Sequence, residues 1–224
     1  MCGLYSFRKT AEEVASYFKL ASTPPLAPRD YVTPGGPMAL LRQGPKGLML
    51  DHMRWGLIPA WVKKIEPGAK PLINARSETI LEKPSFTHSF RRRRCLIPAD
   101  GFFEWVGETG RKQAFHITRP DGGVFTFAGL YDHWMGQDGS ELETACIITT
   151  EANRTISIIH HRMPVVIHPE NYEAWLAGET VKAEDLLPLL KPAPEDYFKA
   201  IKTEIAKPRR EAAIKPKPRQ LDLF

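Results

Sequence analysis

Residues 114–149 decide the fold: they read AFHIT over Ala114–Thr118, VFTFAGLY over Val124–Tyr131 and TACIIT over Thr144–Thr149. All three segments are short and rich in aromatic or β-branched residues, and turn-forming Gly, Asp and Pro residues lie between them. This pattern predicts successive β-strands joined by turns. The centre of the chain is therefore expected to form an antiparallel sheet.

The flanking sequence adds strands and short helices. Strands are predicted over Cys2–Phe7, Met38–Arg42, Leu48–Trp55, Ile73–Arg76 and Arg162–Ile167, and Cys95–Trp105 is apolar without clear alternation. Helices are predicted from a Thr10 cap to Phe18, over Pro84–Arg93, Pro169–Leu176 and Leu186–Leu190, and over Asn153–Ile159 as a helix or turn. Irregular segments are predicted over Thr23–Pro37 and over Ile58–Pro71, which carries Trp61.

These elements indicate an α+β fold with a single compact domain over residues 2–205, built on an antiparallel, barrel-like β-sheet with short peripheral helices. Residues 206–224 differ from this domain because they are rich in Pro and in basic residues and poor in apolar ones. Such a segment is predicted to be a disordered basic tail. It ends in the apolar cluster Gln220–Phe224.

Composition narrows the class of protein. The 224 residues are 42% hydrophobic and 25% charged, and 31 Lys and Arg against 26 Asp and Glu give a net charge of +5. The basic residues gather at Arg91–Arg94 and Lys207–Arg219, which suits a polyanionic partner or solvated faces. Three widely spaced cysteines argue against a disulfide framework, and no Cys or His spacing fits a metal, so neither metal nor cofactor is expected. No signal peptide or membrane span is visible, so a cytoplasmic protein is expected.

Cys2 is the chemical clue. A small second residue favours removal of Met1, which would leave Cys2 with a free α-amine beside its thiol. The reference pKa values of these groups, about 8 and about 8.5, allow both to react near neutral pH. Such an aminothiol can attack an acyl carbon, or it can condense with an aldehyde and close a thiazolidine ring. The alternative is a small residue buried in a strand.

Three further segments resemble parts of a site. Asn74 and Arg76 face one side of a strand and can grip a phosphate, although a turn and a surface ion pair would also explain them. Glu104 lies among aromatic residues, where burial would raise its pKa and suit it to proton transfer, unless an arginine pairs with it. His160 precedes a strand, where it can serve as an acid or base or can be a structural histidine. Its neighbour His161 is expected to take no part in the reaction.

Five strings in this order resemble the SRAP family (SOS-response-associated peptidase domain, abasic-site processing proteins): Met1–Gly3, Trp55–Pro59, Asn74–Thr79, Cys95–Trp105 and His160–Pro164. The resemblance runs from residue 2 to about residue 176. It implies capture of abasic sites in single-stranded DNA through the N-terminal cysteine as a thiazolidine, within the DNA-damage response. The Schiff base formed on the way can also undergo β-elimination, so a weak strand-nicking lyase activity is expected. The family name indicates removal of Met1, either autocatalytic or by an aminopeptidase.

Carried over by motif, the resemblance makes Cys2 the nucleophile, with Glu104 orienting its amine and His160 protonating the sugar. Asn74 and Arg76 would hold the phosphates, and Trp61 would stack near the lesion. The sequence departs from the family at Leu4, where arginine is usual, around Tyr31, and in lacking an Asn-rich segment near the C-terminus. We therefore expect the chemistry to be kept and the DNA context preference to differ.

Gln220, Leu221, Leu223 and Phe224 resemble the motif that binds the bacterial sliding clamp, in which apolar anchors on an extended tail enter a cleft. With DNA and this clamp as partners and no membrane, a monomer at the nucleoid is expected. Two rival functions remain open at this point. One is an N-terminal-nucleophile amidotransferase or peptidase, and the other is a non-covalent adaptor that joins single-stranded DNA to the clamp.

Overall fold

A ring of five strands closes within the part of the chain that the computed structural model describes, which is residues 2–66, 68–108 and 111–205. The strands are β3 (Pro37–Gly44), β4 (Gly47–Trp55), β6 (Arg94–Ala99), β9 (Phe125–Met135) and β10 (Glu141–Glu151). They pair in the order β4–β3–β6–β9–β10, and β10 returns to β4. All of these pairs are antiparallel except β10 with β4. The predicted barrel-like sheet is confirmed, and its closure depends on that one parallel pair.

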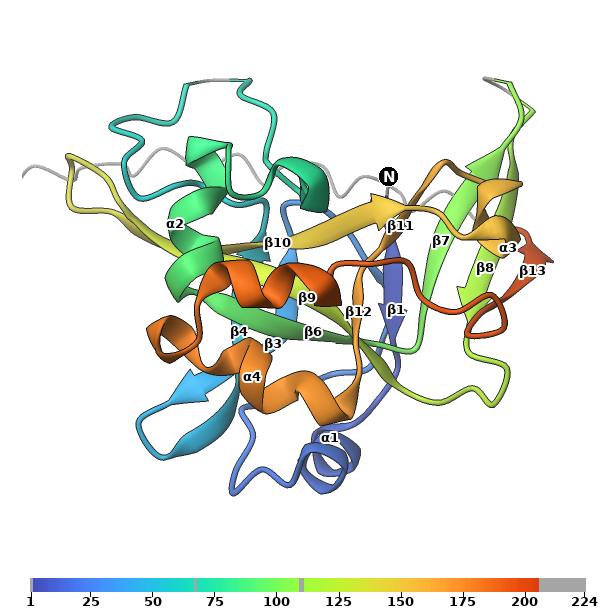
Figure 1. Ribbon diagram of the computed structural model, residues 1–224, viewed down its shortest axis with the longest axis horizontal. Helices are drawn as coiled ribbons and strands as arrows, with labels where there is room; N and C mark the ends of the chain where they lie inside the picture. The colour runs from blue at the N-terminus through green and yellow to red at the C-terminus, as the bar shows by residue number, and fades with distance from the viewer. Residues whose placement is uncertain (1, 67, 109–110, 206–224) are drawn as a thin grey trace, which may run out of the picture.

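A second, open sheet packs against the barrel. Its order is β13 (Lys199–Thr203), β8 (Gln113–Thr118), β7 (Gly101–Val106), β1 (Tyr5–Phe7) and β2 (Arg29–Val32). The Tyr5 ring joins the two layers, with centroids 5.4 Å from Trp55 and 5.9 Å from Phe127. One hydrophobic cluster contains residues from both sheets, so they form a single domain. Figure 1 shows β7, β8 and β13 on the opposite side of the barrel from α2.

β10 also pairs with two short strands that matter for the site, β5 and β11. β5 (Asn74–Arg76) runs parallel to β10 just beyond the end of β4, with Asn74 opposite Ile147 and Arg76 opposite Thr149. On the other edge of β10, β11 (Arg162–Pro164) pairs antiparallel beyond the end of β9. β12 (Val166–Ile167) then pairs with β9. Two segments that lie far apart in the chain are thus brought to the two edges of one strand.

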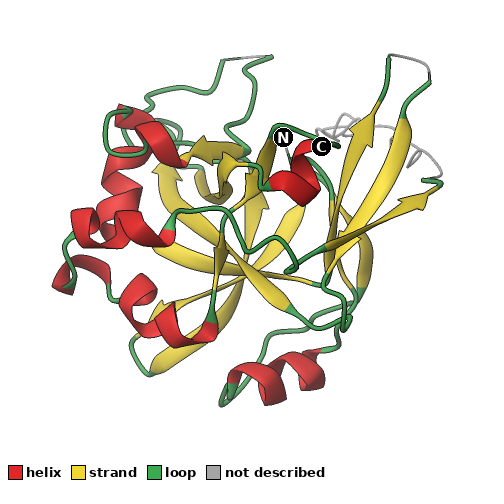
Figure 2. Cartoon of the chain, turned by 45° about the vertical axis from the view of Figure 1, so that its right-hand side comes forward, coloured by secondary structure: helices red, strands yellow, loops and turns green. Residues whose placement is uncertain are grey.

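Short helices lie around the strands (Figure 2). The α-helices are α1 (Ala11–Phe18), α2 (Pro84–Arg92), α3 (Arg154–Ser157) and α4 (Tyr172–Leu176). The 3₁₀ helices are η1 (Ser77–Thr79), η2 (Pro169–Asn171), η3 (Gly178–Thr180) and η4 (Ala183–Leu189). Thr10 caps α1 as predicted, through a reciprocal capping box with Glu13. No helix in the described ranges is long and apolar enough to cross a membrane.

The sequence missed three features of this fold. The segment predicted to be irregular contains the edge strand β2, and edge strand β13 was not predicted. Each pairs with a neighbour on one side only and has mostly exposed side chains, so neither shows a clear pattern. Cys95–Trp105 forms two strands in different sheets, and the chain turns sharply between them. A Cβ at Gly101 would lie 2.2 Å from His116 Nε2, so a larger residue at this turn would require the His116 ring to move.

Candidate functional site

Cys2 is held between the two sheets. The residues before β1 also run beside β7, where the Phe103 amide donates to the Leu4 carbonyl at 2.9 Å. From the barrel side, Asn74 Nδ2 donates to the Cys2 carbonyl at 3.0 Å. The Cys2 side chain is buried, with 1% of the residue exposed. Backbone contacts to β7 and a side chain of β5 therefore fix residue 2 in place.

Cys2 and Glu104 lie within each other's electrostatic field. Burial raises the pKa of the Cys2 thiol, and the Glu104 charge raises it further. Burial also raises the pKa of the Glu104 carboxyl, while the charge of His161 partly offsets that effect. β7 carries Glu104 two residues beyond Phe102, which pairs with Tyr5. The thiol is therefore predominantly protonated at neutral pH, and the carboxyl is shifted toward a pKa suited to proton transfer.

His160 lies in the turn between α3 and β11. The Arg162 amide donates to His160 Nδ1 at 3.0 Å, so Nε2 carries the proton of the neutral ring. The Arg162 carbonyl lies 3.2 Å from the same Nδ1 and can accept its proton when the ring is charged. The ring stacks on His161 with centroids 4.5 Å apart. Burial lowers the pKa of His160, which favours the neutral ring near pH 7.

Asn74 and Arg76 differ in their surroundings. The amide nitrogen of Asn74 already has a partner in Cys2. Arg76 is exposed and makes no hydrogen bond or ion pair with the other described residues, yet its charge lowers the pKa of His161 and of Glu78. Of the two residues predicted to hold phosphates, Arg76 is thus the one whose polar group faces solvent beside the site.

The structure does not bring Trp61 into contact with Cys2, Glu104 or His160. It lies in the loop between β4 and β5, 61% exposed, with its indole Nε1 3.4 Å from the Pro84 carbonyl. The loop itself is anchored, because Trp134 Nε1 donates to the Val62 carbonyl and the Ala60 amide donates to Asp132. Trp61 is therefore an exposed aromatic on a fixed loop beside the start of α2.

Two residues of the site were not predicted. Arg162 is buried and binds both carboxylate oxygens of Glu78, at 2.6 and 2.9 Å, and the carbonyl of Thr149 at 2.7 Å. This hydrogen-bonded arginine lowers the pKa of Glu78. Both residues fall inside the segments Asn74–Thr79 and His160–Pro164. Their opposite charges were the available signal, but only the pairing of β5 and β11 with β10 brings them together.

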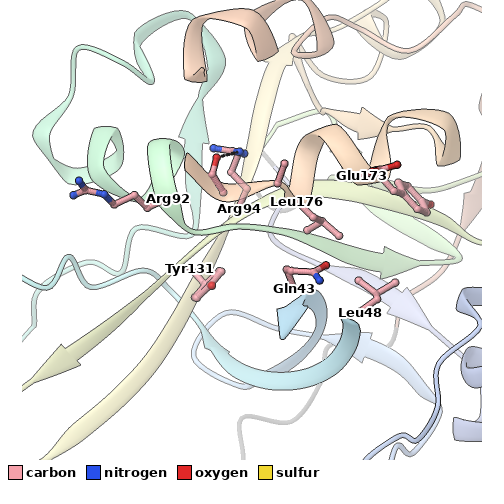
Figure 3. A pocket seen from close by; sticks show the side chains of 10 residues that line it. Gln43, Leu48, Arg92, Arg94, Tyr131, Glu173 and Leu176 are labelled. Carbon is pink, nitrogen blue, oxygen red and sulfur yellow. Dashed lines mark hydrogen bonds between the residues drawn. The ribbon is translucent and has the colours of Figure 1, made fainter. Parts of the chain in front are cut away.

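The basic run Arg91–Arg94 is used within the fold. Arg91, Arg92 and Arg93 form ion pairs with Glu184, Glu179 and Asp132, respectively. Arg94 is buried and donates to the carbonyls of Phe90, Arg91, Trp175 and Gly178. Arg92 and Arg94 line a surface cavity of about 550 Å³ near α4, where they point in different directions (Figure 3). None of the predicted site residues lines this cavity. The run therefore stabilises the domain.

The tail motif and a metal site are the remaining points of the sequence analysis. Gln220, Leu221, Leu223 and Phe224 lie outside the described residues, as does the whole of 206–224. Over the described ranges, no group of three or more His, Cys, Asp and Glu side chains is arranged to hold a metal ion.

Comparison with known proteins gives a consistent result. The family described as SOS response associated peptidase (SRAP) matches residues 1–207. "Abasic site processing protein YoqW" of Bacillus subtilis is 35% identical over 204 residues, covering 89% of this chain and 91% of that protein. "Abasic site processing protein YoaM" of the same organism is 36% identical over 205 residues, covering 89% of each. A crystal structure of a Bacteroides thetaiotaomicron protein is 29% identical with a TM-score of 0.78, covering 91% of this chain and 92% of that one.

Proposed function

The chain belongs to the SOS response associated peptidase (SRAP) family, and on this premise we propose that Cys2 forms a covalent crosslink with abasic sites in single-stranded DNA. Family membership supports the handling of abasic sites, and the contacts of Cys2 support its role as the reacting residue. The crosslink would shield the lesion during replication.

The proposed reaction has two bond-forming stages. Once Met1 is removed, the α-amine of Cys2 attacks the aldehyde of the ring-opened abasic sugar, and loss of one water gives a Schiff base. The thiol then adds to the C=N carbon, its proton passes to the nitrogen, and a five-membered thiazolidine closes. Because burial and Glu104 raise the pKa of the thiol, the amine is the better first nucleophile. Ring closure is favoured because it is intramolecular.

The neighbouring residues take separate roles in this proposal. Glu104 moves protons at the Cys2 amine and thiol, and His160 protonates the ring oxygen of the sugar as it opens. Asn74 fixes the Cys2 carbonyl, and so orients the amine of the same residue. Arg76 holds a phosphate next to the lesion, and Trp61 stacks on a base further along the strand. Such stacking contributes about 1–3 kcal/mol per base.

One observation carries the proposal: the Asn74 amide holds the Cys2 carbonyl at 3.0 Å while the charge of Glu104 acts on the Cys2 thiol. A small residue that merely fills a strand would not need a polar side chain from another sheet to fix its backbone. The N-terminal aminothiol would instead be presented in a defined orientation beside an acid and a base.

The test is denaturing electrophoresis of protein confirmed by mass spectrometry to begin at Cys2, mixed with a single-stranded oligonucleotide carrying one abasic site. A shifted band is expected that requires both the abasic site and Cys2, and is lost in Cys2→Ala. Absence of that band from correctly processed protein would refute crosslinking. Glutaminase activity lost in Cys2→Ala would then favour an amidotransferase, and binding indifferent to Cys2 would favour a non-covalent adaptor.

Two side activities belong to the same proposal. The Schiff base can undergo β-elimination before the thiol closes the ring, which would nick the strand as an abasic-site lyase does. Shortened oligonucleotide in the same gels would reveal it, and Cys2→Ala should not produce it through this route. Removal of Met1 by the protein itself is tested by purifying Glu104→Gln, which keeps Cys2 but should retain Met1 if the active site performs the cleavage.

We also propose that Gln220, Leu221, Leu223 and Phe224 bind the bacterial sliding clamp, which would place the protein on replicating DNA in the cytoplasm. The support is the sequence Gln-Leu-Asp-Leu-Phe at the end of a basic tail. Deleting residues 220–224 should abolish clamp capture in pull-down experiments while leaving crosslinking unchanged. Clamp binding that survives the deletion would refute this role.

A further inference from the structure

Arg162 connects the two edges of strand β10. Its backbone lies in β11, opposite Glu151 of β10. Its guanidinium reaches the Thr149 carbonyl of β10, and then Glu78, which follows β5 on the opposite edge. The guanidinium is buried, with 7% of the side chain exposed, whereas 42% of the Glu78 side chain is exposed. The ion pair therefore joins the Asn74–Arg76 segment to the His160 segment.

The same arginine holds His160 through its backbone. Its amide donates to Nδ1 at 3.0 Å, and its carbonyl lies 3.2 Å from that atom. A two-residue tether of this kind fixes the ring only if the backbone of Arg162 is itself fixed. Glu78 supplies the bidentate, charge-assisted partner that holds the buried guanidinium in one geometry.

We propose that Glu78 is a positioning residue for His160, acting through Arg162. This inference rests on the proposed function, because the role of His160 in capture belongs to that proposal. Glu78 does not touch the reacting atoms in this scheme. It keeps Nδ1 of His160 on the Arg162 backbone, so that Nε2 remains the atom that exchanges a proton with the sugar.

The contact between Arg162 and His160 affects a quantity that can be measured, the pKa of His160. Besides the charge of the N-terminal amine, the charged groups of the described residues that act on His160 and its stacked neighbour His161 are Arg162 from β11, Arg76 from β5 and Glu104 from β7. The charge of Arg162 lowers the pKa of His160, and the hydrogen bond to its carbonyl raises it. Without the Glu78 carboxylate, the arginine charge is uncompensated and the carbonyl contact loosens. Both changes lower the pKa of His160.

The experiment compares the full-length wild type with Glu78→Gln, Glu78→Asp and the matched control Glu82→Gln, which removes one exposed carboxylate four residues away. The titration midpoint of the His160 imidazole is followed by NMR, with the resonance assigned from His160→Gln. Single-turnover crosslinking to an abasic oligonucleotide then gives the maximal rate and the half-saturating protein concentration at each pH.

Glu78→Gln should lower the His160 midpoint, move the pH dependence of the maximal rate downward with it, and slow capture about tenfold. Glu78→Asp should restore most of both, and Glu82→Gln should resemble the wild type. An unchanged midpoint and rate in Glu78→Gln, or equal changes in Glu82→Gln, would overturn the proposal. If Glu78→Gln does not fold, Glu78→Asp is compared with Glu82→Asp. Glu78→Asp should then lower the His160 midpoint by a smaller amount than Glu78→Gln would, and no difference between the two variants would overturn the proposal.

The two readouts separate this inference from the proposed function. A wild type that never crosslinks would refute capture by Cys2, yet the NMR midpoints would still show whether Glu78 positions His160. If the wild type crosslinks normally and substitution of Glu78 changes neither the His160 midpoint nor the maximal rate, only the positioning role is refuted.

Discussion

Replacing Asn74 by aspartate is a sharp test of the site, because the two side chains have nearly the same shape. The amide nitrogen donates to the Cys2 carbonyl at 3.0 Å, and an aspartate would place a second acceptor there. The variant loses a hydrogen bond with a net value of about 1 kcal/mol, and it places a charged acceptor against the carbonyl oxygen at a further cost of about 1 kcal/mol. A total of about 2 kcal/mol corresponds to a roughly thirtyfold slower capture if the transition state feels all of it.

The added charge acts in the same direction. A carboxylate beside Cys2 would raise the pKa of the thiol and of Glu104 further, because like charges disfavour ionisation. Asn74→Ala removes the hydrogen bond without adding an acceptor, so its loss should be about fivefold. The expected order of capture rates is therefore wild type, then alanine, then aspartate, although aspartate is the closer mimic of asparagine in shape.

Single-turnover crosslinking over a range of protein concentrations separates the two roles considered for Asn74. If its amide holds Cys2, the loss appears in the maximal rate. If it holds a phosphate, as the family resemblance suggested, the loss appears in the half-saturating concentration. A normal maximal rate in Asn74→Asp, with all of the defect in DNA affinity, would refute the assignment made from the structure.

Three further outcomes are expected. Arg76→Gln should weaken binding of undamaged single-stranded DNA and reduce the slope of log affinity against log salt by about 0.7, as measured by fluorescence anisotropy, because one phosphate contact is lost. Glu104→Gln should slow capture but raise the Tm at pH 7.5. The reason is that a carboxyl with a raised pKa favours folding at low pH and loses that contribution as the pH rises through its folded pKa. The difference in Tm between the variant and the wild type should therefore vanish near pH 4. Arg94→Met should lower the free energy of unfolding in urea by about 3 kcal/mol or more, because several buried carbonyls lose their donor. Arg91→Met removes an exposed ion pair and should lower it by less than about 1 kcal/mol. Equal losses in the two variants would contradict this.

The sequence predicted the interior strands and the helices α1 and α2 well, because each carries a local signal. The hairpin of β3 and β4 follows from two apolar segments around Gly44–Gly47, and α1 follows from the capping box at Thr10. The edge strands β2 and β13 carry no such signal, since a single neighbour and mostly exposed side chains define them. The parallel pairing of β4 with β10 joins Trp55 to Ala145, and no local pattern encodes that contact.

The site was predicted only in part, for a related reason. Cys2 and Glu104 could be singled out because their residue types are chemically unusual in those positions. The contact of Asn74 with Cys2 depends on the meeting of two sheets, so the sequence gave no sign of it and suggested only a phosphate ligand. Charge counting located the four arginines from Arg91 to Arg94 but gave no sign of their partners, which are acidic side chains and backbone carbonyls, several of them from distant segments.

Strand β10 sets the relative positions of several candidate site residues. Its one edge carries Asn74 and Arg76, its other edge leads to His160, and Arg162 ties the two edges through Glu78. The Cys2–Glu104 pair comes instead from the second sheet, where the chain leading into β1 runs beside β7. Asn74 joins these halves by a direct hydrogen bond to the Cys2 carbonyl. Loosening either connection should therefore slow capture without removing any reacting group, because in this scheme the rate depends on the relative placement of amine, acid and base.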